Sequence, residues 1–194
     1  MKIFDISQEV FRGQVYPGDL VPSYEVVSDI RQGDHYNLSN ITMCVHNGTH
    51  MDAPSHYIPD GKTIDKIDLT KCIGQVEVVE AHGEISADDI KELLEKDKNE
   101  IISRVLFKGK CYVSLEAARE INKNQMVLVG VEAQSIEMDD SLSLVHKELL
   151  SNEVILLEGI HLGNVPTGRY TLYATPLKLG GLEGSPCRAV IIAE

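Results

Sequence analysis

The sequence predicts an α/β fold in which helices pack on a mixed β-sheet. Alternating and β-branched apolar residues, which are typical of strands, fill the first part of the chain. Helix-like segments with capping residues then alternate with short apolar strands. The chain has 194 residues, of which 43% are hydrophobic and 25% are charged. This size supports a substantial core, and we predict one domain over residues 1–194.

The strand-like segments come first. Phe4 and Ile6 alternate with polar neighbours, as in a half-buried strand. The Pro-Gly pair within residues 16–19 then predicts a turn. Alternating and β-branched apolar residues predict three further strands, over residues 21–30, 36–45 and 73–80.

Three helices are predicted after residue 85. Ser86 caps the first, with acids in its first turn, where the macrodipole favours them. Ser114 caps the second, which runs to about residue 121, and Ser141 opens the third. The stripes expected to face the sheet are Ile90, Leu93 and Leu94 in the first helix, and Leu142, Val145 and Leu149 in the third. Strands are predicted at 101–107, 126–129 and 154–157, and β-rich sequence at 169–175 and 187–193.

Charge and cysteine usage exclude several classes of protein. The net charge of −12 disfavours nucleic acid and anionic membranes as partners. Residues 1–7 contain Asp5 and lack the apolar stretch of a signal peptide, so a cytoplasmic location is expected. No apolar run approaches the ~18 residues of a membrane span. The four cysteines are widely spaced, which favours reduced, buried thiols.

The segment from His46 to His56 carries the strongest functional signal. In an extended strand, side chains two residues apart share a face, so His46, His50, Asp52 and His56 would project together. Imidazole nitrogens and a carboxylate oxygen suit zinc, manganese or iron. The segment therefore predicts most of a metal centre on one strand-like ribbon. Cys44 would share this face and could lie beside the ligands.

Two later polar residues stand in apolar surroundings. His146 falls on the inward stripe of the third predicted helix, where a lone histidine is most often a hydrogen-bonded core residue. Glu158 ends a buried strand, and open α/β sheets bind ligands at such ends. Alternatively, Glu158 begins an exposed loop. Together the two residues could complete a metal site.

The chain resembles the family of metal-dependent cyclases and hydrolases that includes bacterial kynurenine formamidase and isatin hydrolase. Its signature, H-x-G-T-H-x-D-x-P-x-H, is matched at His46, Gly48, Thr49, His50, Asp52, Pro54 and His56. The likeness extends from Phe4–Ser7 to Pro176–Leu179 and Gly184–Pro186, and so covers nearly the whole chain. It implies a fold of the swivelling β/β/α type and a single metal-dependent hydrolase domain.

The resemblance also implies a division of roles. His46 and His50 would bind one metal and His146 the second, while Asp52 and Glu158 would bridge both. His56 would be the proton donor and acceptor. The implied cofactors are two divalent ions, with zinc expected and manganese as the alternative. The family is usually dimeric or larger, so a homodimer or higher homo-oligomer is expected.

Some positions depart from the formamidase pattern. Tyr16 replaces the tryptophan that packs on substrate, which makes Tyr16 a candidate substrate-binding residue. The segment 108–113 is shorter than in formamidases. Residues 132–135 read Glu-Ala-Gln-Ser in place of Asp-Thr-Pro-Ser. These departures leave the expected metal ligands unchanged, but they allow substrates other than N-formylkynurenine.

The expected activity is hydrolysis of a small amide, with an arylformamide such as N-formylkynurenine, from tryptophan catabolism, as first choice. A metal-bound water can reach a pKa of about 7, and His56 can then carry a proton to the leaving nitrogen. One alternative keeps the site but hydrolyses a cyclic amide such as isatin, or a lactone. A non-enzymatic alternative is a structural metal-binding module, although such sites are often rich in cysteine.

Overall fold

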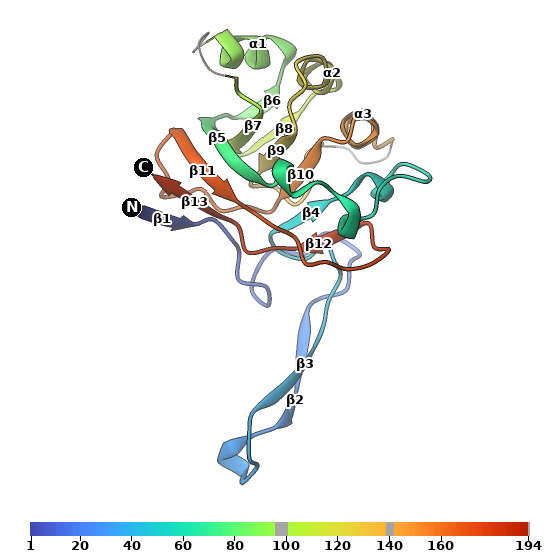
Figure 1. Ribbon diagram of the computed structural model, residues 1–194, viewed down its shortest axis with the longest axis vertical. Helices are drawn as coiled ribbons and strands as arrows, with labels where there is room; N and C mark the ends of the chain where they lie inside the picture. The colour runs from blue at the N-terminus through green and yellow to red at the C-terminus, as the bar shows by residue number, and fades with distance from the viewer. Residues whose placement is uncertain (96–100, 139–141, 194) are drawn as a thin grey trace.

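A curled mixed sheet forms the centre of the computed structural model, which describes residues 1–95, 101–138 and 142–193 (Figure 1). Within these residues nine strands pair in the order β1 (Lys2–Asp5), β13 (Val190–Ala193), β11 (Gly168–Tyr173), β5 (Ile73–Glu80), β7 (Arg104–Lys108), β9 (Leu128–Val131), β10 (Ile155–Glu158), β4 (His50–Asp52) and β12 (Gly184–Pro186). The predicted α/β class, with a mixed sheet and packed helices, is confirmed.

The middle of the sheet is parallel and its margins are antiparallel. Strands β5, β7, β9 and β10 run parallel, and all other neighbours in the sheet pair antiparallel. The helices α1 (Ala87–Glu95), α2 (Leu115–Lys123) and α3 (Leu144–Ser151) connect the parallel strands in turn. All three lie on one side of the sheet in Figure 1. This arrangement follows from parallel pairing, which requires a crossover between successive strands.

The first two helices begin where the sequence predicts. Ser86 Oγ accepts the N–H of Asp89 at 3.3 Å, and the Asp89 carboxylate accepts the N–H of Ser86 at 2.8 Å. Ser114 Oγ accepts the N–H of Ala117 at 3.1 Å. Each side chain thus satisfies a backbone donor that has no partner within the helix.

The start of the third helix differs from the prediction. Ser141 lies outside the described residues, and α3 begins at Leu144. Leu142 is 63% exposed, so its expected place on the buried stripe is wrong. It precedes the first helical turn and therefore does not share the helical periodicity. Val145 and Leu149 are buried as predicted.

Alternation along the parallel strands divides the core into two clusters. Val105, Val129 and Leu156 face the helices and pack with them. Leu106 and Leu128 face the opposite side, against the outer strands and the loops beneath the sheet. The sheet is therefore covered on both faces, as its nearly continuous apolar strands require.

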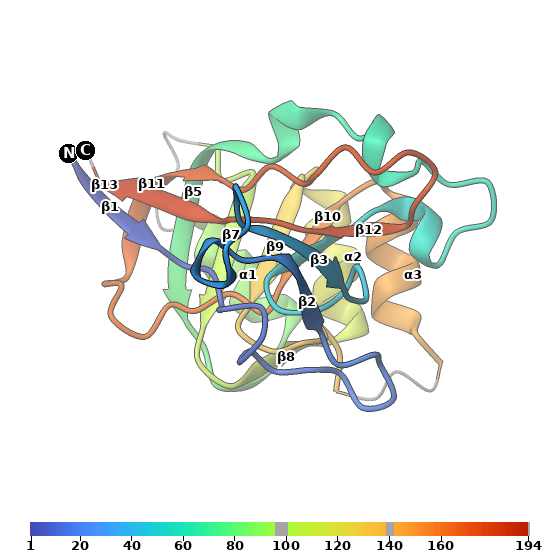
Figure 2. The same ribbon diagram turned by 90° about the horizontal axis from the view of Figure 1, so that it is seen from below.

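The strands predicted at 21–30 and 36–45 form a separate ribbon. They appear as β2 (Ser23–Ser28) and β3 (Leu38–Thr42), which pair antiparallel. They project away from the sheet in Figure 1 and lie in front of it when the molecule is seen from below in Figure 2. We call these two strands and their connection the arm. A small parallel pair, β6 (Gly83–Ile85) with β8 (Cys111–Val113), was not predicted. Short 3-10 helices occupy η1 (Ile30–Gln32), η2 (Pro54–His56), η3 (Ile64–Lys66) and η4 (Leu69–Lys71).

The cysteines agree in part with the expectation of reduced, buried thiols. All four cysteines are free thiols, and Cys72 and Cys111 are buried. None of the helices in the described ranges is long and apolar enough to cross a membrane.

Candidate metal centre

Strand pairing brings three of the predicted ligands together. His50 and Asp52 are two residues apart on β4, so their side chains face the same side of the sheet. In the antiparallel pair of β4 with β10, Glu158 lies directly opposite His50. His50 Nε2 lies 3.3 Å from Glu158 Oε2 and 3.5 Å from Asp52 Oδ1. Glu158 is only 3% exposed, so it does not begin an exposed loop.

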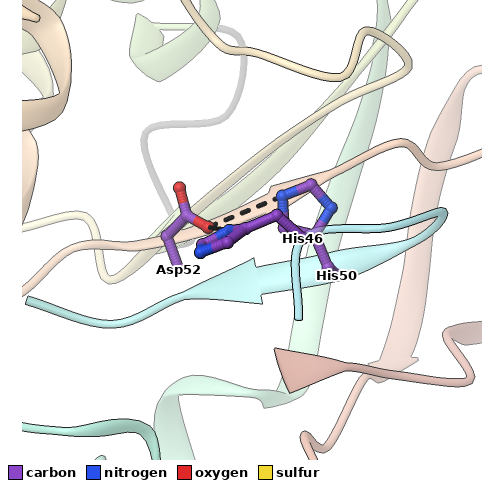
Figure 3. A group of neighbouring side chains, drawn as sticks. All are labelled: His46, His50 and Asp52. Atoms are coloured by element: carbon purple, nitrogen blue, oxygen red, sulfur yellow. Dashed lines mark hydrogen bonds and ion pairs between the residues drawn. The ribbon is translucent and has the colours of Figure 1, made fainter. Parts of the chain in front are cut away.

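A turn, and not the β4 strand, brings His46 to this same cluster of side chains. The β4 strand covers only His50–Asp52, and Gly48 adopts a φ of +65° between the two histidines. The turn brings His46 Nδ1 to 2.9 Å from Asp52 Oδ1 (Figure 3). The predicted single ribbon is therefore wrong in its backbone geometry, although these three side chains do converge. A Cβ at Gly184 would lie 2.7 Å from His46 Cε1, so glycine leaves room for the ring.

The third helix supplies His146. Its Nε2 lies 3.5 Å from Glu158 Oε1 and 3.8 Å from Asp52 Oδ2, and its side chain is 3% exposed. On the other side of the ring, Nδ1 lies 2.5 Å from Oε1 of Glu137. No sequence pattern indicated Glu137, because it lies in an irregular segment nine residues before His146.

Two groups of side chains could therefore hold a metal in the described part of the chain. The first, here the local set, consists of His46, His50 and Asp52. The second, here the assembled set, consists of Asp52, His146 and Glu158. Within each set the ligand atoms lie within 4.8 Å of one another, and Asp52 belongs to both.

His56 lies beside both sets and belongs to neither. It is in η2, and its ring stacks on His46 with 4.2 Å between the centroids. The centroid of His146 is 6.1 Å away. Burial lowers the pKa of His56 below its usual value. A neutral imidazole at this position can accept a proton near neutral pH.

The histidines and acids shift one another's pKa. Burial acts to lower the pKa of His50, but hydrogen bonding to Glu158 and the charge of Asp52 raise it to about 9. Burial likewise opposes the charge on His146, yet hydrogen bonds to Glu137 and Glu158 raise its pKa to about 11. Burial acts to raise the pKa of Asp52, but His46 and His50 lower it. The imidazoles hold protons that a metal cation would replace.

The donor set fits a divalent metal. Asp52 Oδ2 and His46 Nε2 are both buried without a hydrogen-bond partner among the described residues, and Glu183 Oε1 lies 3.5 Å from that nitrogen. Such unpartnered polar atoms are costly inside a protein unless something binds them. Nitrogen and carboxylate oxygen donors are those preferred by zinc and manganese.

A small cavity opens onto the candidate ligands. It has a volume of about 200 Å³, and Tyr16, which is 37% exposed, lies in its wall. Its other lining residues are Asp19, His46, His50, His56, Tyr57, Gln134, Ser135, His146 and Glu158. Gln134 and Ser135 belong to the segment 132–135, which the family resemblance associates with substrate. Asp19 and Tyr57 were not among the predicted site residues, since a loop residue has no periodicity to indicate where it points.

Other segments singled out in the sequence lie close by. Residues 109–112 line a wider cavity of about 950 Å³ that shares Ser135 with the small one. Cys44 is half-buried and belongs to neither ligand set; its backbone N–H donates to Asn47 Oδ1.

Comparisons with known proteins identify the family of the chain. Residues 4–138 match the family model Cyclase, described as "Putative cyclase". The chain is 32% identical to the kynurenine formamidase of Erythrobacter litoralis, over 98% of this chain and 93% of that one. A solved "predicted metal-dependent hydrolase" from Bacillus stearothermophilus is 31% identical, with a TM-score of 0.82, over 98% of this chain and 97% of that chain.

Isatin hydrolase A from Labrenzia aggregata shares the fold, with a TM-score of 0.84 at 23% identity. That likeness covers 100% of this chain and 94% of the hydrolase. From the match over residues 4–138 and the nearly full-length relatives, we conclude that the chain belongs to the Cyclase family.

Proposed function

We propose that the protein is a metal-dependent hydrolase that cleaves the C–N bond of an arylformamide such as N-formylkynurenine. The convergence of two candidate ligand sets on Asp52, beside a cavity, is the observation that carries this proposal. Membership of the Cyclase family and relatives named kynurenine formamidase support hydrolysis of an amide bond.

Two sets of candidate ligands that share Asp52 favour two divalent ions, for which zinc is our first choice and manganese the second. Three buried acids, Asp52, Glu137 and Glu158, lie within or beside these sets. Buried acids need compensating positive charge, which divalent ions would supply when they displace the imidazole protons. Asp52 and Glu158 would bridge the ions, His46 and His50 would bind one, and His146 the other. When bound, such ions lower the pKa of a coordinated water and polarise a carbonyl group.

His56 is the proposed general acid and base. It lies within the cavity wall, and burial keeps its pKa below the usual value, so that it can take a proton at neutral pH. The amide nitrogen leaves poorly until it is protonated. His56 would accept a proton from the attacking water and donate one to this nitrogen, which completes the proton balance of the hydrolysis.

The surroundings of the cavity support a planar substrate. Tyr16, Gln134 and Ser135 also line an adjoining cavity of about 510 Å³, which provides space for an aryl group beyond the reacting carbon. An aromatic substrate could stack on Tyr16, because aromatic pairs attract beyond the area that they bury.

A cyclic amide or lactone is the second candidate substrate. Two differences from the formamidases favour retaining this second candidate substrate, because both lie at cavity walls. They are Tyr16, in place of the formamidase tryptophan, and the short segment 108–113. The same ligands and His56 could open such a ring by the same proton transfers.

Parallel assays would test the activity and separate the two substrates. Purified protein loaded with zinc, and separately with manganese, would be given N-formylkynurenine, formanilide and isatin. We expect the highest kcat/KM with N-formylkynurenine. A preference for isatin would select the cyclic amide, and no turnover of any of the three by metal-loaded protein would contradict both. Metal analysis of the same preparation would count the ions.

We also propose that the protein forms a homo-oligomer through the arm. Tyr24, Val26 and Ile41 alternate with polar residues and share one face, where they are 61%, 53% and 62% exposed. A two-stranded ribbon is marginally stable alone, and the apolar face would be covered by a second copy.

Light scattering of an arm variant would test this assembly. We expect Ile41→Ser to shift the protein toward monomer, and Asn40→Ser on the polar face to leave it unchanged. A monomeric wild-type protein at micromolar concentration would contradict the assembly.

A further inference from the structure

Glu137 makes a pair of contacts that the proposed chemistry does not yet use. It is 9% exposed, and both of its carboxylate oxygens have a partner. Oε1 accepts from Nδ1 of His146 at 2.5 Å. Oε2 accepts from the backbone N–H of Val145 at 3.1 Å, in the first turn of α3. The carboxylate therefore contacts both the ring of His146 and the backbone that carries it.

These contacts determine which ring nitrogen of His146 is available. An ionised carboxylate only accepts hydrogen bonds, so the hydrogen must be on Nδ1 of His146. In the neutral ring, Nε2 then holds the free electron pair. That atom lies 3.5 Å from Glu158 Oε1 and 3.8 Å from Asp52 Oδ2, among the other members of the assembled set.

His50 of the local set is oriented differently. Its Nδ1 lies 3.0 Å from the backbone carbonyl oxygen of Gly48, which bears no net charge. A carboxylate partner raises the basicity of a ligating imidazole more than a carbonyl does. The two histidines thus differ in the group that holds the ring.

We propose that Glu137 is a positioning residue for His146. It fixes the tautomer and direction of the ring, and it raises the affinity of the assembled set for its metal. The inference rests on the proposed function, because it assumes that His146 is a ligand. Loss of such an outer partner typically weakens metal binding by about 10–100-fold.

Metal titration of four variants tests this role. Glu137→Ala removes the carboxylate, whereas Glu137→Gln keeps the size of the side chain and one acceptor oxygen. The matched control is Glu132→Gln, since both oxygens of Glu132 accept backbone N–H groups, from Gly109 and Leu162, each at 2.7 Å. The metal ion, or equivalent, whose binding is lost in His146→Ala is the one that depends on this ring.

The readouts are zinc affinity, by competition with a chromophoric chelator, and the visible absorption of the Co²⁺-loaded protein. We expect Glu137→Ala to weaken the equivalent that depends on His146 by about 10–100-fold and Glu137→Gln to weaken it less. Both should change the Co²⁺ spectrum of that equivalent, while Glu132→Gln leaves affinity and spectrum as in wild type. The other equivalent should bind normally in each variant, which reports that the fold is intact.

Two results would count against the inference and are distinguishable. Suppose that the wild-type protein binds the metal ion that depends on His146, and that both Glu137 variants keep its affinity and spectrum. The positioning role of Glu137 is then overturned, while the proposed ligand set stands. If His146→Ala binds metal with the stoichiometry and affinity of wild type, the proposed ligand set fails and the inference falls with it.

Discussion

The local and the assembled ligand sets differ in how far apart their members lie along the chain. His46, His50 and Asp52 come from seven consecutive residues, and a turn at Gly48 brings them together. His146 and Glu158 lie about a hundred residues further on, one on a helix and the other on a strand. The local set needs one turn and one short strand, whereas the assembled set needs α3 packed correctly against the sheet.

The difference shows where packing controls the chemistry. The direction of His50 is fixed by a backbone carbonyl within its own segment. The position of His146 depends on buried neighbours such as Val145 and Leu149, which hold α3 on the sheet. Disturbance of the helix layer should therefore reach the assembled set first, while Asp52 connects the two sets.

Replacement of Asp52 should have the largest effect, because it removes the residue that both sets share. Asp52→Ala should lose both metals and reduce activity below detection. Glu158→Ala should also lose metal and activity, with the assembled set weakened most. Metal content by mass spectrometry and kcat/KM would be measured together. Unchanged metal occupancy in Asp52→Ala would show that Asp52 is not a ligand shared by the two sets.

Replacement of His56 should separate proton transfer from metal binding. His56→Ala should reduce kcat by ~10²–10⁴-fold with the metal content unchanged, because general acid and base catalysis supplies about that much. His82→Ala, at a histidine whose side chain is 71% exposed, is the control. Full activity in His56→Ala would remove it from the mechanism, and loss of metal would make it part of the local set.

The raised pKa values of one histidine in each set should make the stability of the metal-free protein depend on pH. The folded-state pKa is about 9 for His50 and about 11 for His146, above the ordinary value of 6.5. Between pH 7 and 8.5 the folded protein stripped of metal therefore holds protons that the unfolded chain does not. Its free energy of unfolding should fall as the pH rises through this window.

Urea denaturation at pH 7.0, 7.75 and 8.5, with a chelator present, would measure this fall. The paired double variant His50→Gln/His146→Gln should flatten the slope. A free energy of unfolding that rises with pH in wild-type protein would contradict the raised pKa values. Zinc affinity should change in the opposite direction and tighten with pH, since binding releases the protons.

The smallest expected effect is at the cavity wall, outside both sets. Tyr16→Ala should raise KM for an aryl substrate by about 2–10-fold, the range that corresponds to ~0.5–1.5 kcal/mol of aromatic contact. Metal content and kcat should change little. Tyr173→Ala, on β11 and with a similar exposure of 42%, is the matched control. An equal change in KM in both variants would show that the Tyr16 contact is not specific.

Local patterns in the sequence predicted the elements well. Ser86 and Ser114 begin helices as expected because capping depends on residues three positions apart. The inward face of His146 and the position of Glu158 at the end of a strand were likewise readable from periodicity. Leu142 failed because the helix begins two residues later, and a periodic pattern does not itself fix a boundary.

Contacts between distant segments could not be predicted in the same way. The predicted ribbon placed His46 on an extended strand, whereas the positive φ of Gly48 turns the chain there. Glu137 lies in an irregular segment, so no repeat indicates that it meets His146. The family resemblance, and not periodicity, associated Gln134 with substrate, and it lines the cavity. Such contacts depend on how separate elements pack, which a single sequence does not display.

The close approach of two glycines bears on metal selectivity. A Cβ at Gly159 would lie 2.3 Å from the carbonyl oxygen of Gly48, so the turn of the local set rests directly on the chain that follows Glu158. The spacing between the two sets is thus determined by main-chain contact instead of by flexible side chains. A rigid span of this kind cannot widen easily around a large ion. We expect the centre to discriminate by ionic radius, accepting Zn²⁺ and Mn²⁺ and rejecting Ca²⁺, which requires more ligands at longer distances.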